Sequence, residues 1–323
     1  MNSHLFPCQL SFSFKPSSKD FFVDEVPLRP YSEKGKFLII RVQKRHISTW
    51  EMLDIFASYL EIKTSEIGYS GLKDKYATTQ QYLSFSKRHL KALKKFFHQD
   101  IVIKEFLYHH KKLQVGELLG NNFVLHLYDV DTNVAGKLQK CLTKFQKYGI
   151  ANYFGKQRFG SGDALEQAKK MINDEIFIKD KKLKHFLISV YQSDLFNKWL
   201  NKRVELSDEN GLKLLKGDVY IDKNSKFFIS NKPLEKEFAL KKVIPTGLLP
   251  GRDLLRAKDQ AREIEELFDD IYLVQKGYRR EAVVYPQNIK TQYDPKKKKM
   301  VLSFFLPKGA YATVLIEALE GRK

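Results

Sequence analysis

Phe37-Leu-Ile-Ile-Arg-Val-Gln43, followed after a short gap by Ser48-Thr-Trp-Glu51, is the stretch that decides the fold class of this chain. The first run is rich in β-branched residues and predicts a strand. The second is a capping-box pattern, a serine with a glutamate three residues later, and it predicts the start of a helix. Five side chains beyond it recur at helical spacing and should face a core: Met52, Ile55, Phe56, Tyr59 and Leu60.

Strand and helix patterns also alternate around this stretch. Strands are predicted at residues 81–85 and 122–128, and helices at residues 88–98 and 133–148. Strands interleaved with helices, some joined by short loops, indicate a mixed sheet with helices packed on it. The sequence therefore predicts an α+β protein.

Beyond Gly149 the pattern changes. Helices are predicted at residues 164–173, 183–204 and 253–272, the last with Asp253 as its N-cap. Between them lie an irregular region with short strands, 208–240, and a breaker segment, Pro245-Thr-Gly-Leu-Leu-Pro-Gly251. Strands at 282–285 and 300–306 and a helix at 311–319 complete the chain. The simplest organisation is an insertion, with 149–284 as a second domain and a discontinuous first domain of 1–148 and 285–323.

The charge balance indicates an anionic partner. The chain has 323 residues, of which 57 are Lys or Arg and 38 are Asp or Glu, so its formal net charge is +19. Such an excess repels itself and commonly accompanies binding to nucleic acid or an anionic membrane. A Lys-rich surface without such a partner is the alternative.

The same sequence argues against a membrane span and a secretory signal, because it has neither an 18-residue apolar run nor a basic segment before an apolar one at its start. Cys8 and Cys141 lie far apart and form no CxxC pair, which suits a reducing cytoplasm and offers no metal site. We therefore expect a cytoplasmic protein without a membrane partner.

Gly68-Tyr-Ser-Gly-Leu-Lys-Asp-Lys-Tyr-Ala-Thr-Thr79 could carry chemistry. It places a single carboxylate, Asp74, between Lys73 and Lys75 in a loop that leads into a strand. Neighbouring ammonium groups favour the ionised acid and can also meet phosphates. An ordinary surface turn explains the same residues.

Asn152-Tyr-Phe-Gly-Lys-Gln-Arg-Phe-Gly160 combines rings, amides, Lys156 and Arg158. Such loops stack rings on unpaired bases and hold the backbone with cations. Tyr153 and Phe154 could equally be core residues. The segment His109-His-Lys-Lys112 is better explained as groove lining than as a metal site, because no ligand partners stand at the required spacing.

Five segments, taken in order, resemble the TruD family of tRNA pseudouridine synthases: Lys19-Asp-Phe-Phe-Val-Asp-Glu-Val26, Gly71-Leu-Lys-Asp-Lys75, Gly120-Asn-Asn-Phe123, Asn152-Tyr-Phe-Gly-Lys-Gln-Arg-Phe-Gly160 and Leu306-Pro-Lys-Gly-Ala-Tyr-Ala-Thr313. The resemblance covers both ends and most of the middle of the chain. It implies a catalytic domain with a mixed, largely antiparallel sheet and flanking helices. It also implies an inserted α/β domain, the two forming an RNA-binding cleft.

The resemblance further implies roles for single residues. Asp74 falls on the family's catalytic aspartate, and Lys15 on a basic residue near the site. Contacts to the uracil or the substrate fall on Phe21, Asn121, Phe123 and Tyr311, the last at a position that is often phenylalanine in the family. Six basic residues are expected to contact RNA: Lys73, Lys75, His110, Lys111, Lys156 and Arg158.

The implied reaction isomerises a D-arm uridine of tRNA, U13, without metal or organic cofactor, and we expect a monomer. Two other hypotheses remain. A catalytically silent RNA-binding protein would explain the charge and the rings but gives Asp74 no purpose. A metal-dependent nuclease would need clustered acids, and the acidic runs at 263–266 and 269–270 look like a solvated helix face.

Overall fold

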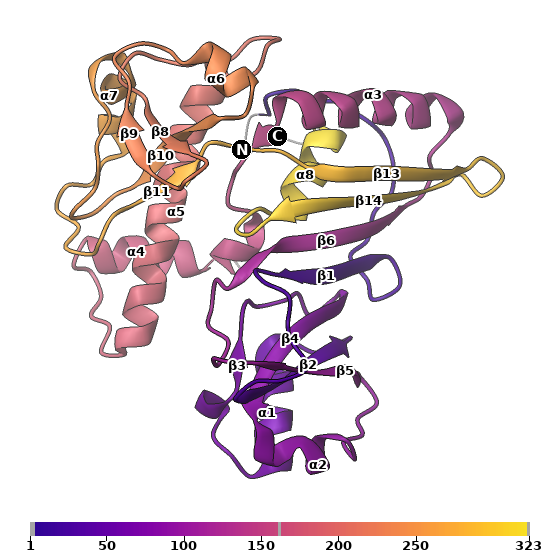
Figure 1. The fold of residues 1–323 in the computed structure, drawn as a ribbon. Helices are drawn as coiled ribbons and strands as arrows, with labels where there is room; N and C mark the ends of the chain where they lie inside the picture. The colour runs from indigo at the N-terminus through magenta and orange to yellow at the C-terminus, as the bar shows by residue number, and fades with distance from the viewer. Residues whose placement is uncertain (1–3, 161–162, 322–323) are drawn as a thin grey trace. The chain divides into compact units, whose positions relative to one another are not determined.

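The computed structural model describes residues 4–160 and 163–321, and its contacts divide the chain into two compact units (Figure 1). The sheet unit comprises residues 11–136 and 287–309, and the helical unit comprises the described residues of 1–10, 137–286 and 310–323. Within the described ranges, no helix is long and apolar enough to cross a membrane.

All of the expected insertion, 149–284, falls in the helical unit. The units differ from the expected domains because residues 1–10, 137–148 and 310–323 group with the insertion. The expected domain boundaries therefore stay a prediction.

One large sheet forms the sheet unit. Its strand order is β13-β14-β6-β1-β4-β2-β5, with β3 paired to β4. Only the β1–β4 pairing is parallel among the described strands. The bounds are β1 Phe21–Pro27, β2 Phe37–Lys44, β3 Gly68–Tyr69, β4 Thr78–Ser86, β5 Ile101–His109, β6 Leu118–Leu127, β13 Gln287–Asp294 and β14 Lys299–Pro307. The predicted α+β class, with a largely antiparallel sheet, is confirmed.

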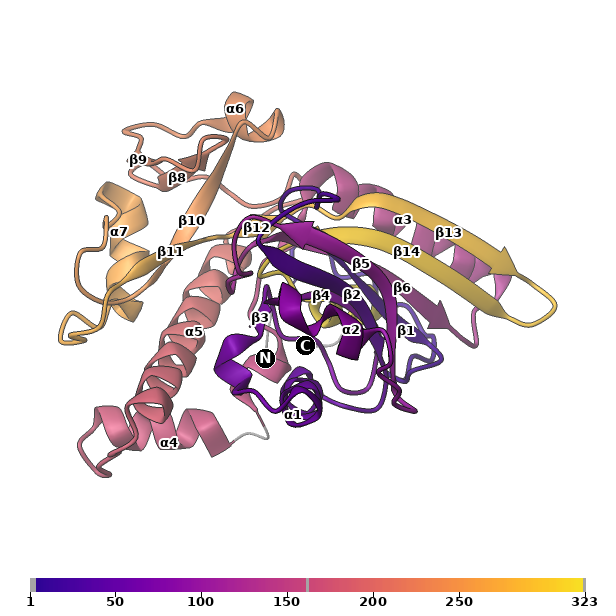
Figure 2. The same cartoon turned by 60° about the horizontal axis from the view of Figure 1, so that its bottom comes forward.

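The predicted helix after β2 forms as α1, Thr49–Leu60, and packs against one face of the sheet (Figure 2). The capping box is complete, since the Ser48 hydroxyl accepts from the Glu51 amide and the Glu51 carboxylate accepts from the Ser48 amide. Met52 and Phe56 are buried against β2 as expected. Tyr59, expected in the core, is 44% exposed, and Leu53 is buried in the same cluster instead.

The helix predicted at 88–98 is much shorter. A 3-10 turn, η2 Lys87–His89, leads into α2, Leu90–Leu93, and β5 follows within a few residues. No side chain caps the start of either element, so the basic, amphipathic pattern lacked a start signal and overstated the helix. A second 3-10 turn, η1 Thr64–Glu66, follows α1, and α3, Thr132–Tyr148, forms as predicted and runs across the boundary between the units.

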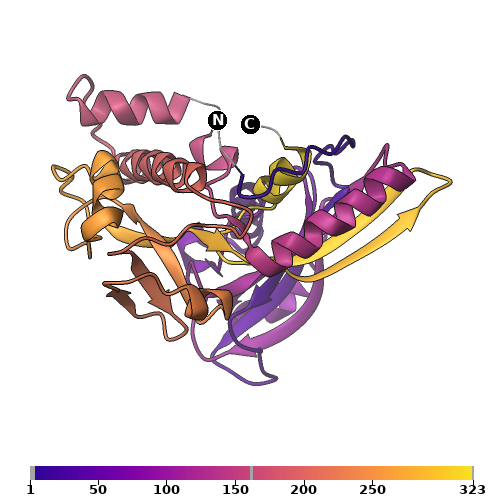
Figure 3. The same ribbon diagram turned by 90° about the horizontal axis from the view of Figure 1, so that it is seen from above.

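The helical unit is built on a long helix, α5 Lys181–Glu205. Helix α4, Asp163–Ile172, packs along α5, and α5 packs against a four-stranded sheet of order β11-β10-β8-β9 (Figure 3). A second pair joins β12 to β7. The remaining bounds are β7 Ile150–Ala151, η3 Lys156–Phe159, β8 Val219–Asp222, β9 Phe227–Ile229, α6 Glu235–Ala239, β10 Val243–Leu249, α7 Asp259–Glu265, η4 Glu266–Phe268, β11 Tyr278–Glu281, β12 Val283–Val284 and α8 Ala312–Glu320.

Two expectations in this unit are wrong. The breaker segment at 245–251 lies largely within strand β10, where Pro245 is tolerated because the ladder with β11 begins only at Thr246. Asp253 is no N-cap, since it has a positive φ of 56° and the helix begins only at Asp259.

The two cysteines form a disulfide between the N-terminal segment and α3, although Cys8 and Cys141 are 133 residues apart in sequence. Their separation therefore no longer supports a reducing compartment. A cytoplasmic location stays an expectation.

Candidate active site

Asp74 lies in the loop between β3 and β4, and every residue from Gly71 to Lys75 except Leu72 is held by a side chain from a neighbouring element. The Gln81 amide donates to the Gly71 carbonyl at 3.4 Å. The Lys73 amide donates to the Thr49 hydroxyl at 2.9 Å. Because these partners stand on β4 and at the start of α1, the loop has a defined path over the sheet.

One hydrogen bond and two salt bridges hold Asp74 and the two lysines beside it. The Lys44 ammonium, at the end of β2, donates to the Asp74 backbone carbonyl at 2.7 Å. Lys75 pairs with Glu51 of α1 at 2.8 Å. Lys73 pairs with Glu25 of β1 at 2.5 Å in a buried salt bridge.

Burial and the neighbouring charges shift the pKa of the Asp74 carboxylate in opposite directions. Burial raises the pKa of Asp74, while the Lys44 and Lys73 ammonium groups favour the ionised form and pull that pKa down. A partly buried carboxylate flanked by two cations can act as a nucleophile or as a base.

The structure brings Asn121 to this carboxylate's side of the sheet. Asn121 of β6 is the cross-strand partner of Glu25, whose carboxylate holds Lys73 next to Asp74. The Asn121 side-chain oxygen is buried and has no hydrogen-bond partner among the described residues. An unsatisfied buried amide oxygen is costly, which suits a group that meets a polar ligand.

The expected rings form a stack on the same sheet face. Phe21 and Phe123 lie with their centroids 6.1 Å apart, and Phe123 stacks on Phe304 at 5.4 Å. Both Phe21 and Phe123 are buried, at 3% and 6% exposure. In this arrangement the two rings pack against other side chains of the sheet face. Either ring would have to become accessible before a base could stack on it. Lys15, expected near the site, is exposed on the segment that precedes β1.

Lys73 is not placed for the RNA contact expected of it. Its side chain is 4% exposed, and its ammonium is engaged by Glu25. The carboxylate also accepts from the Tyr82 amide at 3.4 Å. Lys73 therefore ties the loop to β1 in this structure, whereas Lys75 remains half exposed beside Glu51.

In the helical unit, the 152–160 segment is anchored mainly by amide side chains. Asn197 of α5 accepts from the Phe154 amide at 2.9 Å and donates to the Phe154 carbonyl at 3.0 Å. Tyr153 is fully buried, and its hydroxyl donates to Asn201 at 2.7 Å. Of the two explanations for this segment, the core role holds for Tyr153.

Phe154 is covered by a cation. The Arg280 guanidinium lies 4.0 Å from the centroid of the Phe154 ring and donates to the Asn152 carbonyl and side-chain oxygen. Burial lowers the pKa of Arg280 to about 10. Arg158 lies further from the same ring, at 5.7 Å, and donates to Ser193.

Tyr311, expected in the first helical turn, is the N-cap residue of α8. Its ring lies 6.3 Å from that of Phe154 in an edge arrangement. Lys156 is 92% exposed, with its ammonium 3.5 Å from Glu317 of α8. Lys156 is thus the predicted RNA contact of this unit that is most accessible.

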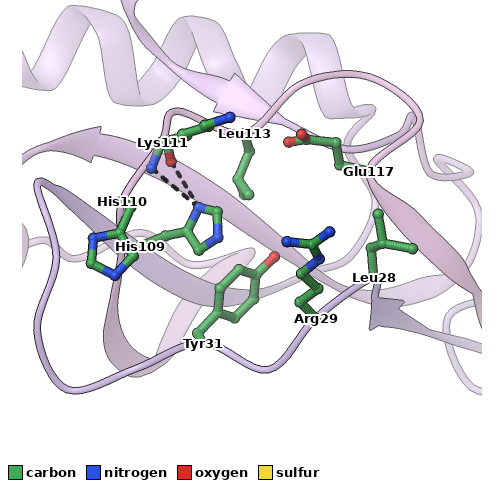
Figure 4. A pocket seen from close by; sticks show the side chains of 8 residues that line it. All are labelled: Leu28, Arg29, Tyr31, His109, His110, Lys111, Leu113 and Glu117. Atoms are coloured by element: carbon green, nitrogen blue, oxygen red, sulfur yellow. Dashed lines mark hydrogen bonds between the residues drawn. The ribbon is translucent and has the colours of Figure 1, made fainter.

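A pocket of about 380 Å³ lies on the sheet unit (Figure 4). Its lining includes Tyr31, His109, His110 and Lys111, and His109 accepts from the Lys111 amide. Tyr31 packs with Tyr82 and Ile39, on the face of β2 opposite to the cluster under α1. His110 and Lys111 thus line this pocket, and they are not among the residues whose side chains hold the Asp74 loop in the described structure.

Several residues of the site were not found from the sequence. Lys44, Thr49 and Glu25 read as ordinary strand or cap residues, and their contacts with the loop join positions 24 to 48 residues apart. Arg280 gave no signal either. One pattern could have suggested that Lys44 and Glu25 have buried side chains. Each is a charged residue within a strand of mainly apolar residues.

Known proteins resemble this chain over nearly its whole length. Residues 9–177 and 163–319 match the family described as tRNA pseudouridine synthase D (TruD). The chain is 40% identical to the tRNA pseudouridine synthase D of a Nitratiruptor species, over 97% of this chain and 96% of that protein. It is 36% identical to the protein of that name from Sulfurimonas denitrificans, with the same coverage.

A solved structure from Methanosarcina mazei that carries the TruD name has the same fold. The TM-score is 0.73 at 22% identity, over 99% of this chain and 96% of that one. The family match over nearly the whole chain and the identity to full-length relatives carry the assignment. This chain belongs to the tRNA pseudouridine synthase D (TruD) family.

Proposed function

We propose that this protein converts the D-arm uridine U13 of tRNA to pseudouridine, with Asp74 as its catalytic carboxylate. The reaction class follows from membership of the family: the protein is a tRNA pseudouridine synthase, an isomerase that acts on uridine in tRNA. The position of the uridine and the roles of single residues are the proposal. The observation that carries it is a single carboxylate, Asp74, in a loop whose backbone and neighbouring lysine are held by Lys44, Thr49 and Glu25.

The reaction breaks the N1–C1′ bond, turns the uracil and joins C5 to C1′. The proton on C5 is lost, and N1 ends with a proton. Positive charge develops on the sugar as the base departs. An ionised carboxylate can attack C1′ or remove a sugar proton, and either route requires Asp74 in its charged form. Lys44 and Lys73 favour that form.

Other residues have complementary roles. The unpartnered Asn121 oxygen can accept from the N3–H of the detached uracil. The aromatic stack that includes Phe21 and Phe123 gives this face an apolar floor that excludes water. Since C1′ is inaccessible in a stacked helix, the target nucleotide is flipped out to react.

The net charge of +19 supplies the attraction to the phosphates. Exposed Lys156 and half-exposed Lys75 are the candidate contacts best supported by their exposure. Tyr311 and Arg158 stand on the helical unit, beside Phe154. We propose that the same unit holds the tRNA while the sheet unit performs the chemistry.

Mapping the product tests the assignment. Unmodified tRNA transcripts are incubated with the protein, treated with a carbodiimide that marks pseudouridine, and read by primer extension. A stop one nucleotide 3′ of position 13, absent when U13 is replaced by cytidine, supports the proposal. A stop elsewhere overturns the position, and no stop on any tRNA overturns the reaction.

A further inference from the structure

Lys44 is the least exposed lysine in contact with the Asp74 loop. It is the last residue of β2, it is 1% exposed, and its ammonium donates to two backbone carbonyls. One belongs to Asp74, at 2.7 Å, and the other to Ile47, at 2.8 Å. The ammonium therefore joins the catalytic loop to the segment that leads from β2 into α1.

Burying a lysine in this way is costly, because the charge loses its hydration. Among the described residues no carboxylate stands within salt-bridge distance of Lys44 to compensate. Burial accordingly lowers the pKa of Lys44 to about 8, against the attraction of Asp74 and Glu51 and with repulsion from Lys73. A cation kept at this cost beside a catalytic loop suggests a role beyond packing.

We infer that Lys44 is a positioning residue for catalysis, which holds the Asp74 backbone in place and favours the ionised carboxylate. This inference rests on the proposed role of Asp74. It assigns Lys44 no contact with the RNA. Its two effects are separable, because the hydrogen bond sets the geometry and the charge sets the acidity of Asp74.

Both effects lead to measurable changes in Lys44→Met, which keeps an unbranched side chain, one atom shorter, and removes the donor and the charge. A misplaced carboxylate lowers kcat, by about 100-fold if the displacement approaches 1 Å. Losing one of two nearby cations raises the pKa of Asp74, so the acidic limb of the rate profile moves upward by about one pH unit or more. The remaining charged groups near the loop, Lys73, Glu25, Lys75 and Glu51, are unchanged in this variant.

The experiment measures single-turnover rates on a U13-containing tRNA from about pH 5 to pH 8.5, together with tRNA affinity and melting temperature. Four proteins are compared: wild type, Asp74→Asn, Lys44→Met and Lys241→Met. Lys241 is the control for loss of a lysine-to-carbonyl hydrogen bond, since its exposed side chain also donates to a backbone carbonyl at 2.7 Å, but in the helical unit. If Lys44→Met does not fold, Lys44→Gln, which keeps an N–H donor and lacks the charge, replaces it.

The inference predicts a slower Lys44→Met with an upshifted acidic limb, unchanged affinity for tRNA, and a wild-type profile for Lys241→Met. It is overturned if Lys44→Met keeps the wild-type rate, or if it loses activity only in proportion to its stability with the acidic limb unmoved. Activity in Asp74→Asn would instead refute the proposed function on which the inference rests.

Discussion

Replacing Lys73 by methionine should destabilise the sheet unit strongly. The change removes the cation that compensates Glu25, whose side chain is fully buried and lies 2.5 Å from the lysine nitrogen. Removing one member of a buried pair typically costs about 3–5 kcal/mol, because the other charge is left uncompensated. For a unit of roughly 150 residues, this corresponds to a fall in melting temperature of about 6–20 °C.

Urea unfolding at pH 7, followed by tryptophan fluorescence and circular dichroism, measures the loss. The double variant Glu25→Gln/Lys73→Met should recover most of it, since the glutamine removes the charge and keeps an acceptor for the Tyr82 amide. Burial raises the pKa of Glu25, and without Lys73 the hydrogen bond from the Tyr82 amide is what still opposes that increase. A raised folded-state pKa destabilises the fold as pH rises through it, so the deficit of Lys73→Met should shrink toward pH 5. A single variant within about 1 kcal/mol of wild type, or a deficit independent of pH, would refute this reasoning.

Three further outcomes are expected. Because burial raises the pKa of Asp74, ionising this carboxylate costs stability at neutral pH. The Asp74→Asn variant should therefore melt at or above the wild-type temperature at pH 7, and the difference should disappear near pH 4. A lower melting temperature of the variant at pH 7 would contradict this. Asn197→Leu leaves the amide and the carbonyl of Phe154 without partners and should cost about 2–6 kcal/mol in urea unfolding of the helical unit, whereas a loss below about 1 kcal/mol would show that these bonds are replaced. Affinity for tRNA should fall about tenfold or more between about 50 and 200 mM salt, as filter binding would measure, and a flat profile would exclude phosphate contacts as the main source of binding.

Local patterns predicted the elements that depend on neighbouring residues. The helix α1 is an example, because the Ser48–Glu51 capping box is satisfied within one turn. The strands β2 and β6 follow from runs of β-branched and apolar residues in the same way. The pairing of β1 with both β4 and β6 could not be read from these runs, since it joins segments far apart in the chain.

Errors occurred where tertiary contacts override a local signal. Pro245 and Gly247 mark a break in most sequences, yet they lie in β10, where Trp199 of α5 packs against the glycine. The region of Asp253 carries helix-forming residues, but Asp253 has a positive φ of 56° and the helix begins only at Asp259. In both cases the fold depends on packing against α5 or on loop contacts that no local pattern encodes.

In the candidate site too, residues in short motifs could be predicted, whereas residues that act through long-range contacts could not. The family resemblance identified Asp74 and Asn121 because they stand in short motifs. The position of Lys73 beside Asp74 led to the expectation that it contacts phosphates, whereas Glu25, 48 residues earlier, holds its ammonium inside the protein. The residues that support the loop, Lys44 and Thr49, became visible only once the strands were assembled.

Tritium release tests the central claim most directly. Unmodified tRNA labelled with tritium at uridine C5 is incubated with the wild type and with Asp74→Asn, in the presence of EDTA, and released tritium is measured alongside RNA binding. The account predicts release by the wild type, none by the variant, and equal binding by both. Release by Asp74→Asn at the wild-type rate would contradict the assignment of the carboxylate, and binding without release by either protein would favour an RNA-binding protein that does not catalyse.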